Sequence, residues 1–496
     1  MKKFLVVLLS VLCTCCIIAG VSACKKGNET EKLFSEGLAY TLLEDDTYAV
    51  TGMGTCSDTK IIVPNNYKGK AVTSISAGAF VSCNSLISIT IPNSVKSIGE
   101  MAFWHCNKLI EVINNSDLEI MKGSEENGYI GYYALNIKKD GTSDIENKGG
   151  WLFYTYETEN YLLGMEDNYN KIELILPESY NGEPYEVYKY AFYKNREIVS
   201  VTISKNILRI NPYAFSLCEK LIEVINNGSL SIVKGSSDNG EIGYYALKIK
   251  EAGASEIVNK NGYFFYKYED VNYLLGYTGK ETELTLPNNY GGEPYEIYKY
   301  AFLGCSKVTK INIPDDVTKI GEGAFEKCNE LATIIIGKRV KSIVNENALF
   351  WGCDKLESID INENNITYYS KNNCIIEKTT QTLIFGCSSS IIPSEVVDIG
   401  SFAFWGCKGL RSITIPDSVT NIGECTFSGC SNLVSIIIPD SVKNIAYGLF
   451  FNCTSLKNIE YKGTVNEWET MEKGNLWNIY LPSDCVIHCT NGDISI

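Results

Sequence analysis

Two thiols and an imidazole lie close together near the C-terminus, in the segment Cys485-Val-Ile-His488-Cys489. Thiolate and imidazole groups are ligands that suit Zn²⁺. On an extended strand, however, Cys485 and Cys489 would be about 13 Å apart along the axis, which is too far to close a metal site or a disulfide. The other histidine, His105, is predicted to be a surface side chain. We therefore predict no metal site.

Patterns typical of catalytic sites are missing from the sequence. It has no P-loop, G-x-G-x-x-G, G-x-S-x-G or H-E-x-x-H segment. Acidic residues are numerous but fall at variable positions, so no carboxylate pair for glycoside hydrolysis can be named. No D-x-D-x-D-G pattern indicates a calcium loop. The sequence predicts a protein that is not an enzyme and that uses no cofactor.

The cysteines follow a pattern that indicates structure rather than catalysis. Nine of the 19 stand three residues after a phenylalanine, and these are Cys83, Cys106, Cys218, Cys305, Cys328, Cys353, Cys407, Cys430 and Cys453. The phenylalanines themselves recur with a period of 23 residues, as from Phe80 to Phe103 and from Phe404 to Phe427. Such a period predicts a solenoid, in which stacked coils share one core.

One repeat predicts one coil of this solenoid. The clearest copy, from Ile75 to Ile98, reads I-x-x-x-A-F-x-x-C-x-x-L-x-x-I-x-I-P-x-x-V-x-x-I. The alternating stretch from Ile87 to Ile91 predicts a short half-buried strand, which ends at Pro92 because proline has no N–H to donate. The A-F-x-x-C-x-x-L part has the spacing of a helical turn, which predicts a short helical or 3₁₀ piece there. The predicted fold is therefore an α/β repeat solenoid that is rich in β-structure and carries inserted β-rich modules.

Stacking would place the nine cysteines in an inward ladder, with one in each coil. Adjacent coils are spaced like strands, at about 4.8 Å. Parallel side chains then hold their Cβ atoms slightly farther apart than the roughly 3.8 Å that a disulfide needs. We therefore predict buried free thiols that pack as small apolar side chains. One copy has Asn195 at this position, which indicates that a small polar group is also accepted.

The repeat pattern resembles the leucine-rich repeats of BspA-type bacterial surface antigens. Ten phenylalanine-centred copies between Ile75 and Tyr461 carry the resemblance, which covers most of the chain. It implies a leucine-rich-repeat-like solenoid and a role in adhesion to host extracellular-matrix proteins or to other cells. The motif is specific for the fold and weak for function, because one fold serves many functions.

The first 23 residues have the features of a lipoprotein signal peptide. Lys2 and Lys3 precede an apolar run from Phe4 to Gly20, which is typical of a secretory signal. The following Val-Ser-Ala-Cys24 resembles a bacterial lipobox, whose cysteine is acylated. This resemblance implies a lipid anchor on Cys24 and an extracytoplasmic, membrane-anchored lipoprotein at the bacterial cell surface. An uncleaved N-terminal membrane helix is the alternative.

Outward-facing side chains of the predicted strands are candidates for a binding face. If Ile89 and Ile91 point inward, their neighbours in the strand point outward, and stacked coils align these neighbours in rows. The candidate residues are Ser88, Thr90, Thr202, Asn312, Ile335, Asp360, Thr414 and Ile437. Small polar groups dominate this face, which suits contact with proteins or glycans. A merely solvated sheet face is the alternative.

Tyrosines gather in two segments that are copies of each other. Gly131-Y-Y-A-L returns as Gly243-Y-Y-A-L, about 110 residues later. Tyrosine offers rigid contact area at interfaces, but it is also a good strand residue. Ligand contact and internal packing are therefore both open for the candidate aromatic contacts, which are Tyr185, Tyr188, Tyr295 and Tyr298.

The predicted organisation alternates coils with other segments. The parts are a lipoprotein signal peptide (1–23), a tether (24–36), a β-rich N-terminal cap (37–74), leucine-rich-repeat coils (75–113), a first Tyr-rich β module (114–185), coils (186–225), a second Tyr-rich β module (226–295), coils (296–363), a hairpin insertion (364–390), coils (391–461) and a C-terminal cap (462–496).

The charge and the repeats together predict a function. The formal net charge of −15 argues against a nucleic-acid partner, which would require a basic patch. We predict a surface-anchored, non-enzymatic binding or adhesion protein that recognises host or microbial proteins through its solenoid. Two alternatives remain: an extracytoplasmic glycan-binding lipoprotein, and a structural spacer of the cell envelope that has no ligand.

Overall fold

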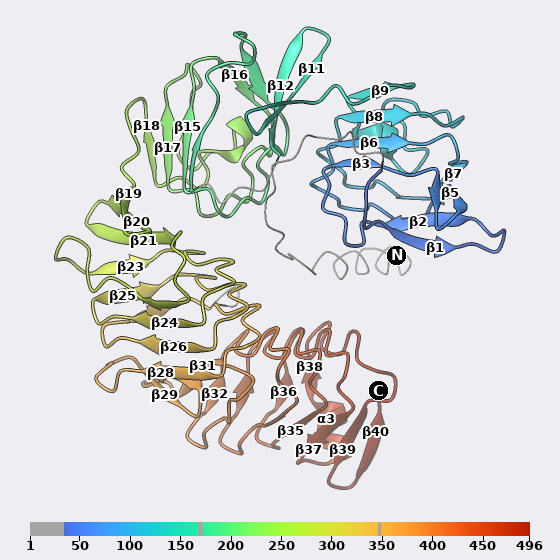
Figure 1. The fold of residues 1–496 in the computed structure, drawn as a ribbon. Helices are drawn as coiled ribbons and strands as arrows, with labels where there is room; N and C mark the ends of the chain where they lie inside the picture. The colour runs from blue at the N-terminus through green and yellow to red at the C-terminus, as the bar shows by residue number, and fades with distance from the viewer. Residues whose placement is uncertain (1–33, 167–171, 346–348) are drawn as a thin grey trace. The chain divides into compact units, whose positions relative to one another are not determined.

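The computed structural model describes residues 34–166, 172–345 and 349–496, which belong to two compact units, 1–253 and 254–496 (Figure 1). Each unit contains stacked coils. The predicted signal peptide, its Cys24 and most of the predicted tether lie outside the described residues. In the described part of the chain, no helix is both long and apolar enough to cross a membrane.

A coil contains two short strands, where the sequence predicted one. β6 (Ser88–Ile91) is the predicted strand, and it lies parallel to β3 (Lys60–Ile62) and β8 (Glu111–Asn114). β7 (Ser97–Ile98) follows after a turn and pairs in parallel with β5 (Lys70–Ile75) of the preceding coil. First strands and second strands therefore form separate sheets, and we call a run of coils with its own pair of sheets a block.

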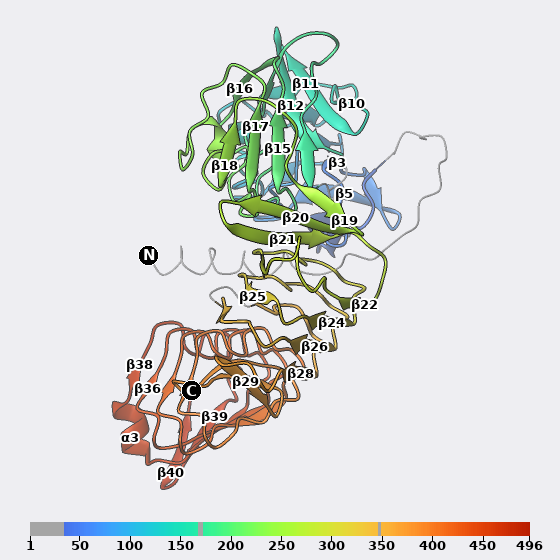
Figure 2. The same ribbon diagram turned by 90° about the vertical axis from the view of Figure 1, so that its left-hand side faces the viewer.

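The first strands of the described residues form four mainly parallel sheets, and Figure 2 shows β22, β24, β26 and β28 following one another in this way. In sheet order, the strands are β3, β6, β8 and β9 (Asn136–Lys138); β13 (Glu173–Ile175), β15 (Ser200–Ile203), β17 (Glu223–Asn226) and β18 (Lys248–Lys250); β22 (Glu283–Thr285), β24 (Lys310–Ile313), β26 (Thr333–Ile336) and β28 (Ser358–Ile361); and β33 (Ser412–Thr414), β35 (Ser435–Ile438), β37 (Asn458–Tyr461), β39 (Val486–Cys489) and β40 (Gly492–Ser495), the last of which is antiparallel to β39.

The second strands form the other sheets of the described residues. In sheet order, these contain β1 (Ala39–Leu42), β2 (Tyr48–Gly52), β5 and β4 (Asn66–Tyr67), with β7 also paired to β5; β10 (Glu146–Lys148), β11 (Trp151–Tyr156), β12 (Glu159–Met165), β14 (Tyr185–Val187) and β16 (Ile207–Ile210); β19 (Val258–Lys260), β20 (Tyr263–Tyr268), β21 (Val271–Tyr277), β23 (Tyr295–Ile297), β25 (Val317–Ile320) and β27 (Ser342–Ile343); β29 (Tyr368–Lys371), β30 (Cys374–Glu377), β31 (Thr382–Gly386), β32 (Asp398–Ile399) and β34 (Asn421–Ile422); and β36 (Asn444–Ile445) with β38 (Glu472–Lys473).

Every block begins with the same element, an antiparallel strand pair whose second strand lies parallel to a strand of the next coil. The pairs are β1–β2 before β5, β11–β12 before β14, β20–β21 before β23, and β30–β31 before β32. The second strand of each pair has a glycine as its last or last but one residue. A Cβ atom on Gly164 would lie 2.8 Å from the carbonyl oxygen of Ala191, so glycine permits close packing on the next coil. The predicted cap, Tyr-rich modules and hairpin insertion thus share one starting element.

The phenylalanine-containing part of each coil is a series of turns, so the predicted helical or 3₁₀ piece is wrong. Gly78 and Ser82, which flank Phe80, have φ angles of 68° and 57°. A right-handed helix requires negative φ throughout. The backbone amide of Phe80 donates instead to the carbonyl oxygen of Ala102 in the next coil, at 2.7 Å. Helices in the described residues are short, namely α2 (Ile130–Tyr133), η1 (Asn239–Glu241) and α3 (Val465–Thr470).

A positive φ recurs two residues after the phenylalanine in all ten copies of the repeat. The residues are Ser82, His105, Lys194, Leu217, Gly304, Lys327, Gly352, Gly406, Gly429 and Asn452. This conformation costs an L-residue other than glycine roughly 1–2 kcal/mol. The amide of Ser82 donates to the carbonyl oxygen of Trp104 at 2.7 Å, so hydrogen bonding between coils holds the backbone in this conformation. The side chain of His105 is exposed, as predicted.

The core runs through the stacked coils. The ring centroids of Phe80 and Phe103 are 5.2 Å apart, and the rings are nearly parallel. Ile89 and Ile91 of β6 are fully buried in the same cluster. A single coil could not bury these side chains, so neighbouring coils stabilise one another.

The predicted ladder of buried thiols is confirmed for six of its nine members, and these thiols also donate hydrogen bonds. Each donates to the carbonyl oxygen of the repeat phenylalanine one coil earlier, at 3.0–3.2 Å, and the pairs are Cys106–Phe80, Cys218–Phe192, Cys328–Phe302, Cys353–Phe325, Cys430–Phe404 and Cys453–Phe427. Cys83, Cys305 and Cys407, which begin runs of coils, are only partly buried. All cysteines in the described residues are free thiols.

Alkylation of the folded protein tests this burial. The thiolate is the reactive form of cysteine, and burial raises the pKa of Cys453 to about 12 and the pKa of Cys430 well above its usual value. We expect a bulky maleimide at neutral pH to leave both thiols unmodified while it modifies the partly exposed Cys489, as read by peptide mapping. Unfolding in urea should make all three reactive. Rapid modification of Cys430 in the folded state would contradict the ladder.

Candidate binding surfaces

Outward-facing residues form aligned rows in the first-strand sheets of residues 254–496. The register pairs Asn312 with Ile335 and Asp360, and Thr414 with Ile437 and Glu460. Asp360 and Thr414 are exposed, and Ile335 and Ile437 are partly exposed, whereas the inward neighbour Ile436 is buried. The predicted alternation therefore holds at these candidate positions.

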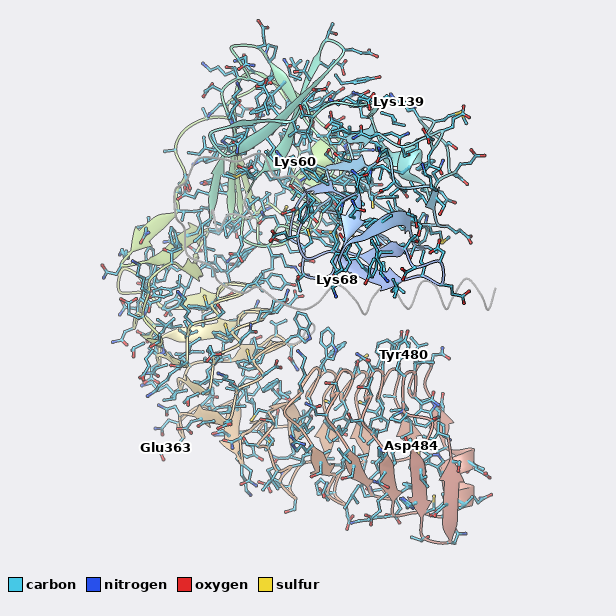
Figure 3. All side chains as sticks on the ribbon, turned by 45° about the vertical axis from the view of Figure 1, so that its right-hand side comes forward. Lys60, Lys68, Lys139, Glu363, Tyr480 and Asp484 are labelled. Atoms are coloured by element: carbon cyan, nitrogen blue, oxygen red, sulfur yellow. The ribbon has the colours of Figure 1, made fainter. Side chains whose placement is uncertain are left out.

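Ser88, by contrast, does not belong to an exposed face. It lies in a row that begins at Lys60, labelled in Figure 3, and continues through Glu111 and Asn136. Ser88 is 2% exposed and Glu111 is fully buried. The expectation that Ser88 points into solvent is therefore wrong. The candidate Thr90, two residues along β6, is partly exposed.

The start of the next block covers this row. Leu152 and Leu163 of the β11–β12 pair pack in one cluster with Ile87 and Ile110, which precede β6 and β8. Tyr154 of β11 accepts a hydrogen bond from the side-chain amide of Asn136 at 2.8 Å. Sequence position gave no sign of this packing, because the covering strands follow β8 by some forty residues in the chain.

Glu111 lies beneath this cover with polar partners around its carboxylate. Lys138 Nζ is 3.1 Å from one carboxylate oxygen, and the backbone amide of Asp144 donates to the same oxygen at 3.2 Å. The Ser88 hydroxyl donates to the other oxygen at 3.3 Å. Burial alone would lower the pKa of Lys138, but its hydrogen bonds to Asp144 and Glu111 outweigh burial and raise that pKa. These contacts link neighbouring strands of the sheet. They also satisfy the Glu111 carboxylate, so no ligand is needed to balance its charge.

The corresponding row of the second block repeats this arrangement. Ser200 is 1% exposed and Glu223 is fully buried, and Lys250 Nζ lies 3.1 Å from the Glu223 carboxylate. The candidate Thr202 is partly exposed. The candidate rows of the first unit are therefore less accessible than those of residues 254–496.

The candidate tyrosines serve mainly as packing residues. Tyr185 and Tyr295 are buried, and their hydroxyls donate to the carbonyl oxygens of Pro177 and Pro287, each at 2.7 Å. Packing is therefore the correct alternative for these two residues, and ligand contact is wrong for them. Tyr188 is 6% exposed. Tyr298 is partly exposed.

His488 has protein partners at the C-terminal end of the fold. Its Nδ1 atom is 3.0 Å from the Asp493 carboxylate and its Nε2 atom is 3.2 Å from the Asn458 side-chain oxygen. Cys485 is buried, whereas Cys489 lies on β39 with His488 and is partly exposed. Within the described ranges, no group of three histidine, cysteine or acidic side chains is placed to hold a metal ion.

The stacked two-strand coils define a repeat solenoid of the leucine-rich-repeat kind. A sequence profile described as "BspA type Leucine rich repeat region" matches six copies in the chain, over residues 54–127, 172–246, 272–388 and 375–488. The chain belongs to this BspA-type leucine-rich repeat family. A search of curated proteins gave no match.

Solved structures of bacterial leucine-rich repeat proteins are similar to the chain at low identity. The leucine-rich repeat protein of T. pallidum is 24% identical, covers 45% of this chain and 90% of its own, and gives a TM-score of 0.28. A leucine-rich repeat protein from Bacteroides ovatus is 19% identical, covers 92% and 98%, and gives a TM-score of 0.28. A leucine-rich cell surface protein from Faecalibacterium prausnitzii is 18% identical, covers 90% and 99%, and gives a TM-score of 0.25.

Replacing Glu111 by alanine tests the polar contacts beneath the covering strands. Removal of the buried carboxylate takes the acceptor from the Ser88 hydroxyl and from the Asp144 amide, which costs about 2–3 kcal/mol, while Lys138 keeps its ion pair with Asp144. We expect Glu111→Ala to lower the free energy of unfolding in urea by about that amount. Glu146, whose ion pair with Lys148 is half exposed, is the matched control, and Glu146→Ala should cost less than about 1 kcal/mol. Equal costs for the two variants would contradict the role given to Glu111.

Proposed function

We propose that the protein is a non-enzymatic binding protein of the bacterial cell surface, which recognises protein ligands through the exposed rows of residues 254–496. The observation that supports this proposal is the open face of two first-strand sheets. The rows Asn312–Ile335–Asp360 and Thr414–Ile437–Glu460 are accessible, whereas the equivalent rows of the first unit lie partly under other strands.

The chemistry of these rows suits a protein partner. Ile335 and Ile437 offer apolar contact area, while Asn312 and Thr414 offer hydrogen-bonding groups beside them. A small apolar centre within a polar rim is typical of protein–protein interfaces. Repeat solenoids provide extended surfaces of this kind, because each coil adds one more residue to every row.

The surface location and the class of partner rest on the family and on the sequence of the N-terminus. The name of the Faecalibacterium prausnitzii structure describes that protein as a cell surface protein. The predicted lipid anchor on Cys24 would hold this chain on the outer side of the membrane. Extracellular-matrix proteins and proteins of other cells are the ligands that the proposal names.

Binding of the purified protein to an immobilised panel of extracellular-matrix proteins tests the proposal. We expect binding to at least one member, and a loss of about tenfold or more in affinity when Ile335→Glu and Ile437→Glu are combined, because central apolar residues carry most interface energy. Asp360 and Glu460 occupy the same rows, so the new carboxylates should not disturb folding.

The control for added charge is Ile391→Glu, which changes an aliphatic side chain that is 69% exposed outside these rows. It should leave binding unchanged. Equal binding by the double variant and the unaltered protein would refute the proposed face. A complete lack of binding to proteins, with normal folding of all variants, would support the spacer alternative.

A further inference from the structure

A cleft of about 540 Å³ opens in the first unit, beside the start of the second block. Its walls come from α2, from β12 and β14, and from the coil that contains β16. A volume of this size lies within the range of about 300–1,000 Å³ that is typical of small-molecule sites. The protein-binding rows of residues 254–496 contribute no residue to it.

Tyrosine dominates the lining of this cleft. Tyr132 and Tyr213 are about half exposed, at 52% and 49%. The rings of Tyr190 and Tyr213 stack with their centroids 5.1 Å apart. Tyr161 packs edge to face against Tyr188, with centroids 5.5 Å apart. The cleft therefore presents both ring faces and phenolic hydroxyls.

Planar hydrogen-bonding groups also line this cleft. The side-chain amide of Asn211 donates to the Glu186 carboxylate at 2.9 Å, which fixes the orientation of both groups. Arg209 stands opposite Glu186 on the neighbouring strand, yet among the described residues it forms no ion pair within 4.0 Å. Its guanidinium therefore retains donors for a ligand.

The second Tyr-rich segment allows a comparison within the chain. It has different residues at several positions that line the cleft in the first segment. The residues Glu159, Arg209, Asn211 and Tyr213 of the first copy correspond to Val271, Lys319, Gly321 and Gly323 of the second. In the second copy, Lys319 lies 3.9 Å from Glu296, so that carboxylate has a cation beside it. The recognition groups of the first copy are thus not required by the coil itself.

Tyr213 also controls where its neighbour lies. Tyr300, the counterpart of Tyr190, is 1% exposed, and a Cβ atom on Gly323 would lie 2.5 Å from its ring. Tyr300 therefore fills the space that a side chain at residue 323 would occupy. In the first copy, the Tyr213 side chain occupies the equivalent position, and Tyr190 stays partly exposed in the cleft.

We propose that this cleft binds a neutral oligosaccharide. Glu159 and Glu186 balance Lys189 and Arg209 in formal charge, so the lining favours neither an anion nor a cation. A pyranose ring presents C–H groups that pack on an aromatic face, and hydroxyls that pair with carboxylate, amide and guanidinium groups. A helical peptide would instead require an apolar groove, and an added peptide strand would require a free strand edge. Among the described lining residues, only Leu135 and Pro212 are aliphatic.

An array of neutral oligosaccharides tests the proposal, followed by titration calorimetry with the strongest hit. We expect binding by the unaltered protein, and a loss of about tenfold or more in affinity for Tyr213→Gly, since one aromatic contact can contribute a factor of this size. Glycine suits this position, where φ is 61°, so the thermal midpoint should not fall. Arg209→Lys, which copies the second segment, should also weaken binding.

The matched control is Tyr244→Ala, which removes the counterpart of Tyr132, a ring that is 54% exposed and does not line the cleft. It should leave the affinity for the oligosaccharide unchanged. The Ile335→Glu and Ile437→Glu variant should also keep this affinity, which separates the cleft from the protein-binding rows. Absence of any hit on the array, or equal affinities for the unaltered protein and Tyr213→Gly, would overturn the proposal.

Discussion

The carbonyl oxygen of the repeat phenylalanine links successive coils. Phe80 O accepts the backbone amide of Cys83 in its own coil at 3.1 Å and the thiol of Cys106 in the next coil at 3.0 Å. A carbonyl oxygen has two lone pairs, so both donors can be satisfied. These two hydrogen bonds fix the register between neighbouring coils. The stacking of the phenylalanine rings and the alignment of the surface rows depend on that register.

The period, the inward isoleucines and the thiol ladder could all be predicted, because each depends on residue types at fixed spacing. The backbone conformation of the turns could not be predicted. Ser82, Lys194 and Leu217 all adopt positive φ, although none of these residue types favours it. At Ser82 and Lys194, backbone hydrogen bonds to the next coil hold that conformation, so the local propensity of these residues gave no sign of it. A residue pattern with helical spacing therefore suggested a helix where the chain makes turns.

The sequence could predict which candidate residues are exposed only for strands on which no other part of the chain packs. Ser88 and Ser412 occupy the same repeat position, yet Ser88 is buried and Ser412 is exposed. The difference arises from the β11–β12 pair, which covers the row of Ser88 from a distant part of the sequence. A glycine at or next to the end of the second strand, as at Gly386 and Gly164, was the available sign that the block starts share one architecture.

A block that carries its own starting strand pair can act as one unit in gene duplication. The corresponding gene segment can be copied whole, since the new copy brings the antiparallel strands that complete its sheet. After copying, the two versions can diverge, as the difference between Tyr213 and Gly323 illustrates. Growth in length and divergence in recognition can thus arise from one and the same genetic event.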